Sequence, residues 1–304
     1  MFKGKRFRKL KLFAATLIGC AAVAAVVAVL VATFLRAQEA RHRQICANNL
    51  RQIGVAFKMY AEDWDGRYPQ SQIDDRNPDD IKVTAFFFNG RAMFPEYLKD
   101  ASPLVCPSDS GGVEAFESGC WNLNGDPTQP FVPESFSGLS YVYFPWVTTS
   151  DEEFEAMAMY VSTKLEPALA LTPPNLEAVG RDMILLGTGW EGKGNAGGDS
   201  LYRLREGIGR FLITDIEGMP GPGRGARPER KIPVMMDWIC AYTTRVYTTT
   251  DLPELPELPK FPPNELDRIP GGANVLFLDG HVEFLKYLGG YPVTPQVSFY
   301  LSDI

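Results

Sequence analysis

The chain has 304 residues, five cysteines and a formal net charge of −7, and 45% of its residues are apolar. This composition is typical of a folded protein and excludes a chain that is disordered throughout. Residues 1–44 hold nine of the 30 Lys/Arg residues and one of the 37 Asp/Glu residues, so residues 45–304 have a net charge of −15. This negative charge on residues 45–304 argues against nucleic acid as a partner. Two histidines leave little room for a histidine-rich metal site, and nothing in the composition indicates an enzyme.

The first 35 residues have the pattern of a membrane anchor. Six Lys/Arg residues between Lys3 and Lys11 precede an uncharged run of 24 residues from Leu12 to Leu35. As a helix this run spans about 36 Å, enough to cross a hydrocarbon core of about 30 Å. The run is too long for the core of a cleavable signal, and the cations before it favour a cytoplasmic N-terminus. We therefore expect a basic cytoplasmic segment (1–11) and a single transmembrane helix (12–35), with the acidic remainder outside the cytoplasm.

Cys20 allows another interpretation of this segment. Residues 17–20 (LIGC) fit the short pattern of a bacterial lipoprotein cleavage site, which would make Cys20 a lipidated first residue. Fifteen uncharged residues follow Cys20, however, and their simplest use is the rest of a membrane helix. The pattern therefore favours a small cysteine inside that helix.

Residues 36–66 predict a helical stalk that continues the anchor. The segment has no proline and a single glycine before Gly66, and its apolar side chains recur three or four residues apart on one helical face. Those residues are Cys46, Leu50, Ile53, Phe57, Tyr60 and Trp64. Asp65-Gly66 supplies a stop, and Pro69 prevents continuation. The apolar face is expected to pack on the protein's own head or on neighbouring copies.

Residues 67–304 read as one turn-rich α+β head domain. A helix is expected over 151–160 with its N-terminus at Ser150-Asp151, and strands over 139–148, 182–186 and 232–236. Asp279-Gly280 separates two short apolar runs and predicts a tight hairpin with positive φ at both residues. Residues 218–230 and 251–263 are rich in Gly and Pro and are expected to be irregular.

Six segments resemble those of one known family, in the same order along the chain. They are residues 46–54 (CANNLRQIG) with Tyr60, Gly66, Tyr68 and Pro69, residues 104–109 (LVCPSD), 140–143 (SYVY), 210–216 (RFLITDI), 232–237 (IPVMMD) and 271–284 (GGANVLFLDGHVEF). Together they resemble type IV pilin-like proteins, and in particular the type II secretion pseudopilin-like group of Planctomycetes and Verrucomicrobia. The chain departs from that group twice. The leader is degenerate, with Thr16 five residues into the apolar run where pilins have Glu, and Ile269 replaces the His of the C-terminal His-x9-Asp-Gly pattern.

The resemblance implies a fold and a function. The fold is a pilin-like α+β structure, in which a long N-terminal helix packs on a head with an antiparallel β-sheet. The function is that of a structural or assembly subunit of a type II secretion or type IV pilus-like system, anchored in the inner membrane with a periplasmic head. Its partners would be other pilin-like subunits or secretion-system proteins. The alternative is a membrane-tethered periplasmic binding protein for glycans or secreted cargo that does not enter a filament. No catalytic residue and no nucleic acid partner is expected.

Four cysteines follow the membrane run: Cys46, Cys106, Cys120 and Cys240. An even number outside the cytoplasm suggests two disulfides, and the residues alone leave three pairings open. In the family, the cysteine of the helix and the cysteine before Pro-Ser often occur together. The resemblance therefore favours Cys46–Cys106 with Cys120–Cys240, and Cys106–Cys120 remains the rival.

Calcium is the cofactor that the resemblance allows, because major pseudopilins can bind it in their C-terminal region. The carboxylates nearest the family-like segments are Asp215, Glu217, Asp237 and Asp279. Calcium takes six to eight oxygen ligands, and the sequence has no DxDxDG-type loop. These four residues are the calcium candidates, and we expect no other cofactor.

Overall fold

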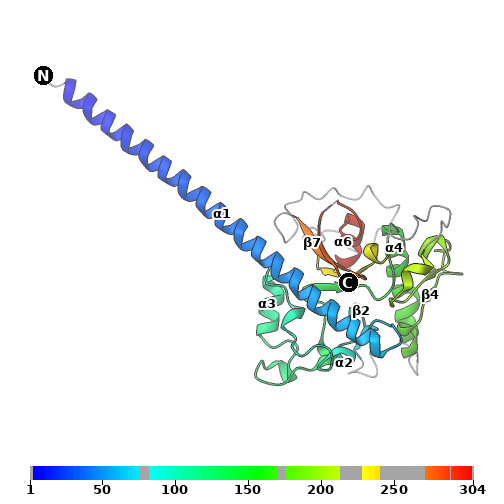
Figure 1. Ribbon diagram of the computed structural model, residues 1–304. Helices are drawn as coiled ribbons and strands as arrows, with labels where there is room; N and C mark the ends of the chain where they lie inside the picture. Colours follow the sequence, from blue (N-terminus) through cyan, green and yellow to red (C-terminus); the bar gives the residue numbers. More distant parts are fainter. Residues whose placement is uncertain are drawn as a thin grey trace. The chain divides into compact units, whose positions relative to one another are not determined.

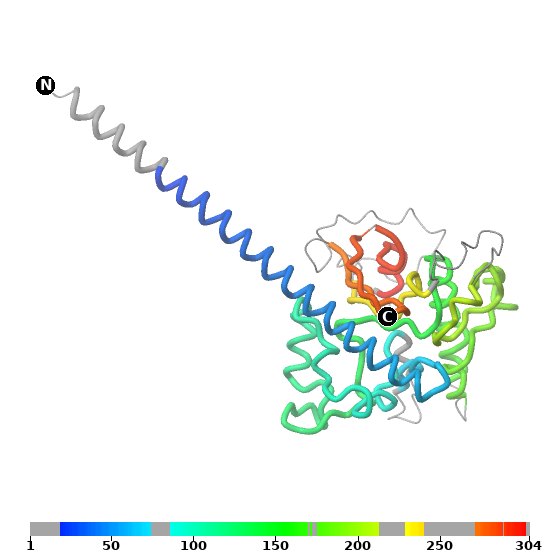
Figure 2. The backbone as a smooth tube through the Cα atoms, in the orientation of Figure 1, coloured from blue at the N-terminus to red at the C-terminus, as the bar shows by residue number. Residues whose placement is uncertain are grey.

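The computed structural model describes residues 3–74, 82–169, 171, 175–212, 228–239, 271–287 and 289–302 (Figures 1 and 2). The chain divides into two compact units, Met1–His42 and Arg43–Ile304, and each is described by itself. The fold is α+β, with a long N-terminal helix and antiparallel sheets. The predicted irregular stretch 251–263 lies outside the described residues, as does 218–230 up to residue 227.

The first unit consists of helix. Helix α1 (Lys3–Asp63) contains every described residue of this unit. Between residues 19 and 35 its apolar side chains are exposed, with Val23 at 64% and Phe34 at 69%. Within the described part of the chain, α1 is the one helix long and apolar enough to cross a membrane. Membrane anchors and signal sequences share this length and composition. The predicted continuation of the helix beyond residue 35 is confirmed, and the helix ends at Asp63, shortly before the predicted stop at Asp65-Gly66.

The second unit is built on a four-stranded antiparallel sheet in the order β3-β6-β7-β8. Its strands are β3 (Tyr141–Tyr143), β6 (Pro233–Asp237), β7 (Gly272–Phe277) and β8 (Val282–Lys286). Figure 2 shows the orange trace of β7 beside the yellow trace of β6, although more than thirty residues separate them along the chain. Every residue of β3, β6 and β7 is buried, so these three strands are covered on both faces, whereas the edge strand β8 is partly exposed.

Helices cover the two faces of this sheet. Alternate side chains of a strand point to opposite faces, and β3 follows this rule: Tyr141 and Tyr143 belong to the core cluster that contains the α1 residues Leu50 and Phe57. Val142 belongs to the other cluster, with side chains of α4 (Asp151–Tyr160) and α6 (Pro295–Ser302). The residues of α1 from Arg43 onward thus pack on one face of the sheet, and α4 and α6 pack on the other.

The remaining elements are short. Two further antiparallel pairs are β1 (Ser71–Asp74) with β2 (Lys82–Phe88), and β4 (Met183–Ile184) with β5 (Ser200–Leu201). The other α-helices are α2 (Gly90–Met93), α3 (Ser110–Glu117) and α5 (Glu166–Leu169), and a π-helical turn over Val161–Leu165 joins α4 to α5. Short 3-10 helices lie between these elements, at Ser102–Leu104, Leu123–Gly125, Pro133–Ser135, Leu176–Gly180, Asn195–Gly197, Ile208–Phe211 and Pro228–Lys231. The predicted helix over 151–160 is confirmed, and the side chain of Ser150 caps it by accepting from the Glu153 amide at 3.2 Å.

The predicted hairpin forms, but its turn differs from the expectation. β7 and β8 pair in register from Gly272↔Lys286 to Leu276↔Val282. The Gly280 amide donates to Phe277 O, the Phe277 amide donates to His281 O, and positive φ falls on Gly280 alone, at +92°. This is a three-residue loop with a bulge at the glycine, in which Asp279 keeps a negative φ. The Asp279 carboxylate also accepts from the His281 amide at 3.1 Å, and this interaction stabilises the longer loop.

Candidate functional site

Five of the six segments that carry the family resemblance, all but residues 210–216, meet at one place in the second unit. Helix α1, the loop before α3, strand β3 and strands β6 and β7 each contribute residues there. We call this group the helix clamp and define it by its members: Cys46, Asn49, Cys106, Asp109, Ser140, Tyr141, Asp237 and Asn274. The clamp is therefore assembled from segments that lie up to 228 residues apart in the sequence.

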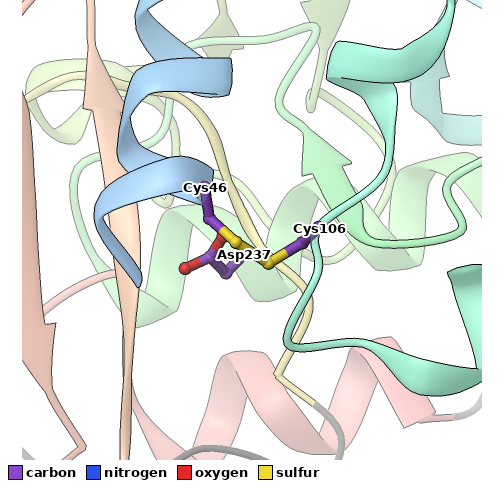
Figure 3. A group of neighbouring side chains, drawn as sticks. All are labelled: Cys46, Cys106 and Asp237. Carbon is purple, nitrogen blue, oxygen red and sulfur yellow. A yellow bond between two sulfur atoms is a disulfide. The ribbon is translucent and has the colours of Figure 1, made fainter. Parts of the chain in front are cut away.

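A disulfide forms the covalent part of the clamp. Cys46 on α1 is bonded to Cys106, with 5.3 Å between their Cα atoms, and both residues are fully buried (Figure 3). This confirms the first predicted pair and excludes the rival Cys106–Cys120. Cys120 is exposed and forms no disulfide with a described residue. Cys240 lies outside the described residues, so Cys120–Cys240 stays a prediction.

Asn49 adds a polar contact one helical turn after Cys46. Its side chain is nearly buried, and Nδ2 donates to Val105 O at 3.1 Å and to the Tyr141 hydroxyl at 3.4 Å. Because Val105 precedes Cys106, Asn49 holds the same loop that the disulfide holds. Buried amides are expensive unless they find such partners. Asn49 therefore sets the position of the helix against both the loop and strand β3.

Asp109 joins the loop to strand β3. It is the N-cap of α3, accepting from the Gly112 amide at 2.9 Å through Oδ1 and from Ser140 Oγ at 2.7 Å through Oδ2. A Cβ at position 112 would lie 2.2 Å from Asp109 Oδ2, so only glycine leaves room for the carboxylate. The PSD and SY segments of the resemblance therefore meet through the Asp109 carboxylate and the Ser140 hydroxyl.

Asp237 lies at the end of β6 beside the disulfide and is fully buried. Its Oδ2 accepts from the backbone amide and from Nδ2 of Asn274, both at 2.7 Å. One ligand-type atom from each of Asp237, Cys46 and Cys106 lies within 4.8 Å of the others (Figure 3). Metal binding by cysteine requires the thiolate, and both sulfurs are committed to the disulfide. While the disulfide is formed, Cys46, Cys106 and Asp237 make a structural contact rather than a metal centre.

The structure does not bring the calcium candidates Asp237 and Asp279 together. The Leu278 amide, next to Asp279, donates to Ile232 O at 3.0 Å. Ile232 lies five residues before Asp237 along β6, which corresponds to about 16 Å of strand. Asp215 and Glu217 lie outside the described residues. A calcium site therefore stays a prediction. Of its described candidates, Asp237 ends β6, and Asp279 lies near the start of that strand.

Asp279 has its own partners at the β7–β8 turn. Its Oδ1 lies against Nδ1 of His281, and its Oδ2 lies 3.7 Å from Nε of Arg230. Partial burial acts to raise the pKa of this carboxyl, but the contacts with His281 and Arg230 outweigh it and hold the pKa below its usual value. The His281 ring stacks on Phe277 with 4.5 Å between ring centroids. Asp279 thus orders the turn.

Sequence reasoning missed Arg203, which fixes the chain after α1. This side chain is 8% exposed, and its guanidinium donates to Pro145 O at 2.6 Å, to Pro69 O at 2.7 Å and to Tyr68 O at 3.4 Å. The Tyr143 hydroxyl also donates to Pro69 O, at 2.8 Å. Burial is the main cause that lowers the pKa of Arg203. Its guanidinium carbon also lies 5.1 Å from the centroid of the Trp146 ring. No local pattern in the sequence marks an arginine whose partners are distant carbonyl groups and a distant aromatic ring.

Comparison of the chain with protein-family models, with curated proteins and with solved structures finds no match. The clamp itself is the basis for any functional statement. Its members make covalent and hydrogen-bonded contacts that hold residues 46–61 of α1 against the sheet. The disulfide and the hydrogen bonds of the clamp therefore fix helix α1 to the sheet.

Proposed function

We propose that this protein is a pseudopilin-like subunit of a type II secretion or type IV pilus-like system, with residues 12–35 in the inner membrane and the second unit outside the cytoplasm. One observation carries the proposal. Helix α1 changes from an exposed apolar run to a stretch buried on one face and fixed by the helix clamp. A subunit that assembles through membrane helices needs such a firm attachment between its helix and its folded domain.

The disulfide supports the proposed location. Disulfides form and persist in oxidising compartments such as the periplasm and are rare in the cytoplasm. Cys46 and Cys106 both belong to the part of the chain that the basic N-terminal segment would place outside. The charge distribution and the cysteine pairing therefore favour the same orientation by independent reasoning.

Cys20 offers a native reporter for assembly. It is exposed and lies in the apolar run, and small residues such as the adjacent Gly19 allow membrane helices to approach closely. Oxidative cross-linking in native membranes is expected to give dimers through Cys20 that disappear in Cys20→Ser. A photoreactive residue at Val26 is expected to give a ladder beyond the dimer, as a filament requires.

The same experiment separates the proposal from its rival. A tethered binding protein that acts alone would give only monomers at both positions while remaining in the membrane fraction. Sequencing the N-terminus of the protein from membranes tests leader processing. Retention of Met1 and the basic segment would contradict a processed pseudopilin and leave the membrane anchor intact.

A further inference from the structure

A small basic surface stands out on the acidic second unit. We call it the arginine patch, and it consists of Arg67, Arg205, Arg210 and Phe211. Arg67, just after α1, and Arg205 face each other in an isolated antiparallel bridge. The guanidinium carbons of Arg205 and Arg210 lie 5.4 and 5.0 Å from the centroid of the Phe211 ring, and this ring is 49% exposed.

The carboxylate next to Arg205 in the sequence does not form a salt bridge with the patch arginines. Glu206 follows Arg205, but its Oε1 accepts from Lys58 Nζ at 2.6 Å and from the Tyr68 hydroxyl at 2.8 Å. In the described ranges of the chain, none of the three patch arginines has a carboxylate within salt-bridge distance, whereas Arg91, Arg181 and Arg230 each have one. The three guanidinium groups therefore leave charge available to a ligand.

The pairing of Arg67 with Arg205 is unfavourable by itself. Like charges directly opposite each other on neighbouring strands destabilise the pair. Local rules of this kind are broken at functional sites more often than elsewhere. An anion bound between the two side chains would turn the repulsion into attraction.

The chemistry of the patch selects the ligand. A guanidinium stacked on an aromatic ring keeps its N–H edge free to pair with a carboxylate or sulfate. Several such groups in one small area fit a ligand with repeated anionic groups. Trp64 lies in the same turn as Arg67, whose amide donates to Trp64 O at 2.9 Å, and its side chain is 55% exposed. One face of this ring stacks on Tyr60, with 5.4 Å between the ring centroids, and the exposed remainder offers an apolar surface that suits the apolar face of a sugar ring.

We propose that the arginine patch binds an acidic polysaccharide through its carboxylate or sulfate groups. A duplex or single strand of nucleic acid carries dense charge and needs an extended basic face. Residues 45–304, with a net charge of −15, do not provide one. A polysaccharide with more widely spaced charges needs only a few arginines. The inference is independent of filament assembly, since it concerns only the second unit.

Binding is tested with the full chain in detergent, using polygalacturonate and chondroitin sulfate as probes and neutral dextran as the blank. Calorimetry is expected to show binding to at least one acidic probe and none to dextran. Arg205→Gln and Arg210→Gln are each expected to weaken binding about tenfold, the usual scale for losing a charge-assisted hydrogen bond. The matched control is Arg181→Gln, which removes an exposed arginine that already pairs with Glu177. A control variant as weak as the patch variants would overturn the proposal.

A stability measurement separates a binding role from a structural one. Arg67→Gln is expected to weaken binding about tenfold and to raise the melting temperature of the free protein, because it removes the like-charge pair. Arg67→Lys keeps the charge and is expected to leave the melting temperature unchanged. A melting temperature that falls in Arg67→Gln would mean that the arginine serves the fold, and the proposal would fail.

Competition decides the class of ligand. Polyglutamate and a single-stranded oligonucleotide at equal charge concentration are expected to displace the polysaccharide poorly. Displacement by either one with equal affinity would assign the patch to an acidic peptide or to nucleic acid and overturn the polysaccharide assignment. Absence of binding to both acidic probes would also overturn the polysaccharide assignment.

Discussion

Helix α1 contains two stretches with the same backbone conformation and opposite surroundings. Between residues 19 and 35 the apolar side chains occur all around the helix and are exposed, with Val23 at 64%. Between Arg43 and Asp63 most of them lie on one face, where Leu50 and Phe57 are fully buried, and a few lie on the outer face, where Val55 is 60% exposed. A helix that is apolar all around suits lipid, and a helix with one apolar face suits packing on a protein core. The distribution of apolar residues around the helix, rather than their number, therefore distinguishes an anchor from a packed element.

The largest effect is expected from cutting the covalent link of the buried stretch. The double change Cys46→Ser and Cys106→Ser opens a loop with a sequence separation of 60 residues. In the chain-entropy model a loop of this size is worth about 4 kcal/mol. Urea unfolding of the second unit measures the loss. The control Val55→Ser places a serine on the 60% exposed outer face of the same stretch, and it is expected to change the free energy of unfolding by less than about 0.5 kcal/mol. An equal loss in both proteins would contradict the clamp.

The next largest effect is expected from a substitution on the buried face of this stretch, compared with one on its exposed face. Leu50→Ala is expected to cost about 3 kcal/mol, because it leaves a cavity where the helix meets the sheet. Val55→Ala, on the exposed face of the same stretch, is expected to cost less than about 0.5 kcal/mol. Thermal or urea unfolding of the two proteins provides the measurement. Equal costs would show that this part of α1 is not packed on one face.

A charge placed in each stretch tests the other half of the comparison. Val27→Arg puts a cation in the exposed apolar run, where insertion into a bilayer is expected to become about 3 kcal/mol less favourable. Val55→Arg puts the same charge on the outer face of the buried stretch and is expected to leave membrane insertion unchanged. Carbonate extraction of membranes distinguishes the two. Release of both variants, or of neither, would contradict the assignment of residues 12–35 to the membrane.

The smallest effect concerns the contacts just after α1. Tyr68 donates to Glu206, which also accepts from Lys58 on the buried stretch. Burial, and then the nearby Glu206 carboxylate, raise the pKa of Tyr68 above its ordinary value. The unfolded chain therefore ionises first, so this contribution to stability is complete below about pH 10 and is lost as the pH rises further.

Tyr68→Phe is expected to cost about 1 kcal/mol at neutral pH through the lost hydrogen bond. It is also expected to lose less stability than the wild type between about pH 9 and pH 11. Urea unfolding at the two pH values checks both statements. An identical pH dependence in the two proteins would show that the Tyr68 hydroxyl is not buried against Glu206.

Sequence patterns predicted the elements whose signals are local. The period of α1, the cap at Ser150 and the apolar runs around Asp279-Gly280 all lie within a few residues of the structure they specify. The predicted type of the hairpin turn was wrong, because Asp-Gly fits both the two-residue turn and the three-residue loop with positive φ at Gly280 alone. Register and a side-chain contact with His281 decide between them, and the sequence displays neither.

The candidate site was only partly predictable for a related reason. The residues alone left three cysteine pairings open, and the resemblance to pseudopilin-like proteins pointed to Cys46–Cys106. The partners of Asp237 and Arg203 could not be inferred, since Asn274 and the carbonyl groups of Pro69 and Pro145 are distant in the sequence. Contacts of this kind depend on the tertiary arrangement and leave no local periodicity.

Protease treatment of spheroplasts tests the central claim most directly. If residues 12–35 span the membrane and the second unit lies outside, protease added from outside will digest residues 43–304 and leave a protected fragment that contains the apolar run. Cells opened before treatment will lose the cytoplasmic residues 1–11 as well. A second unit that stays intact until the inner membrane is broken would contradict the orientation, and with it the proposed role as a membrane-anchored pseudopilin-like subunit.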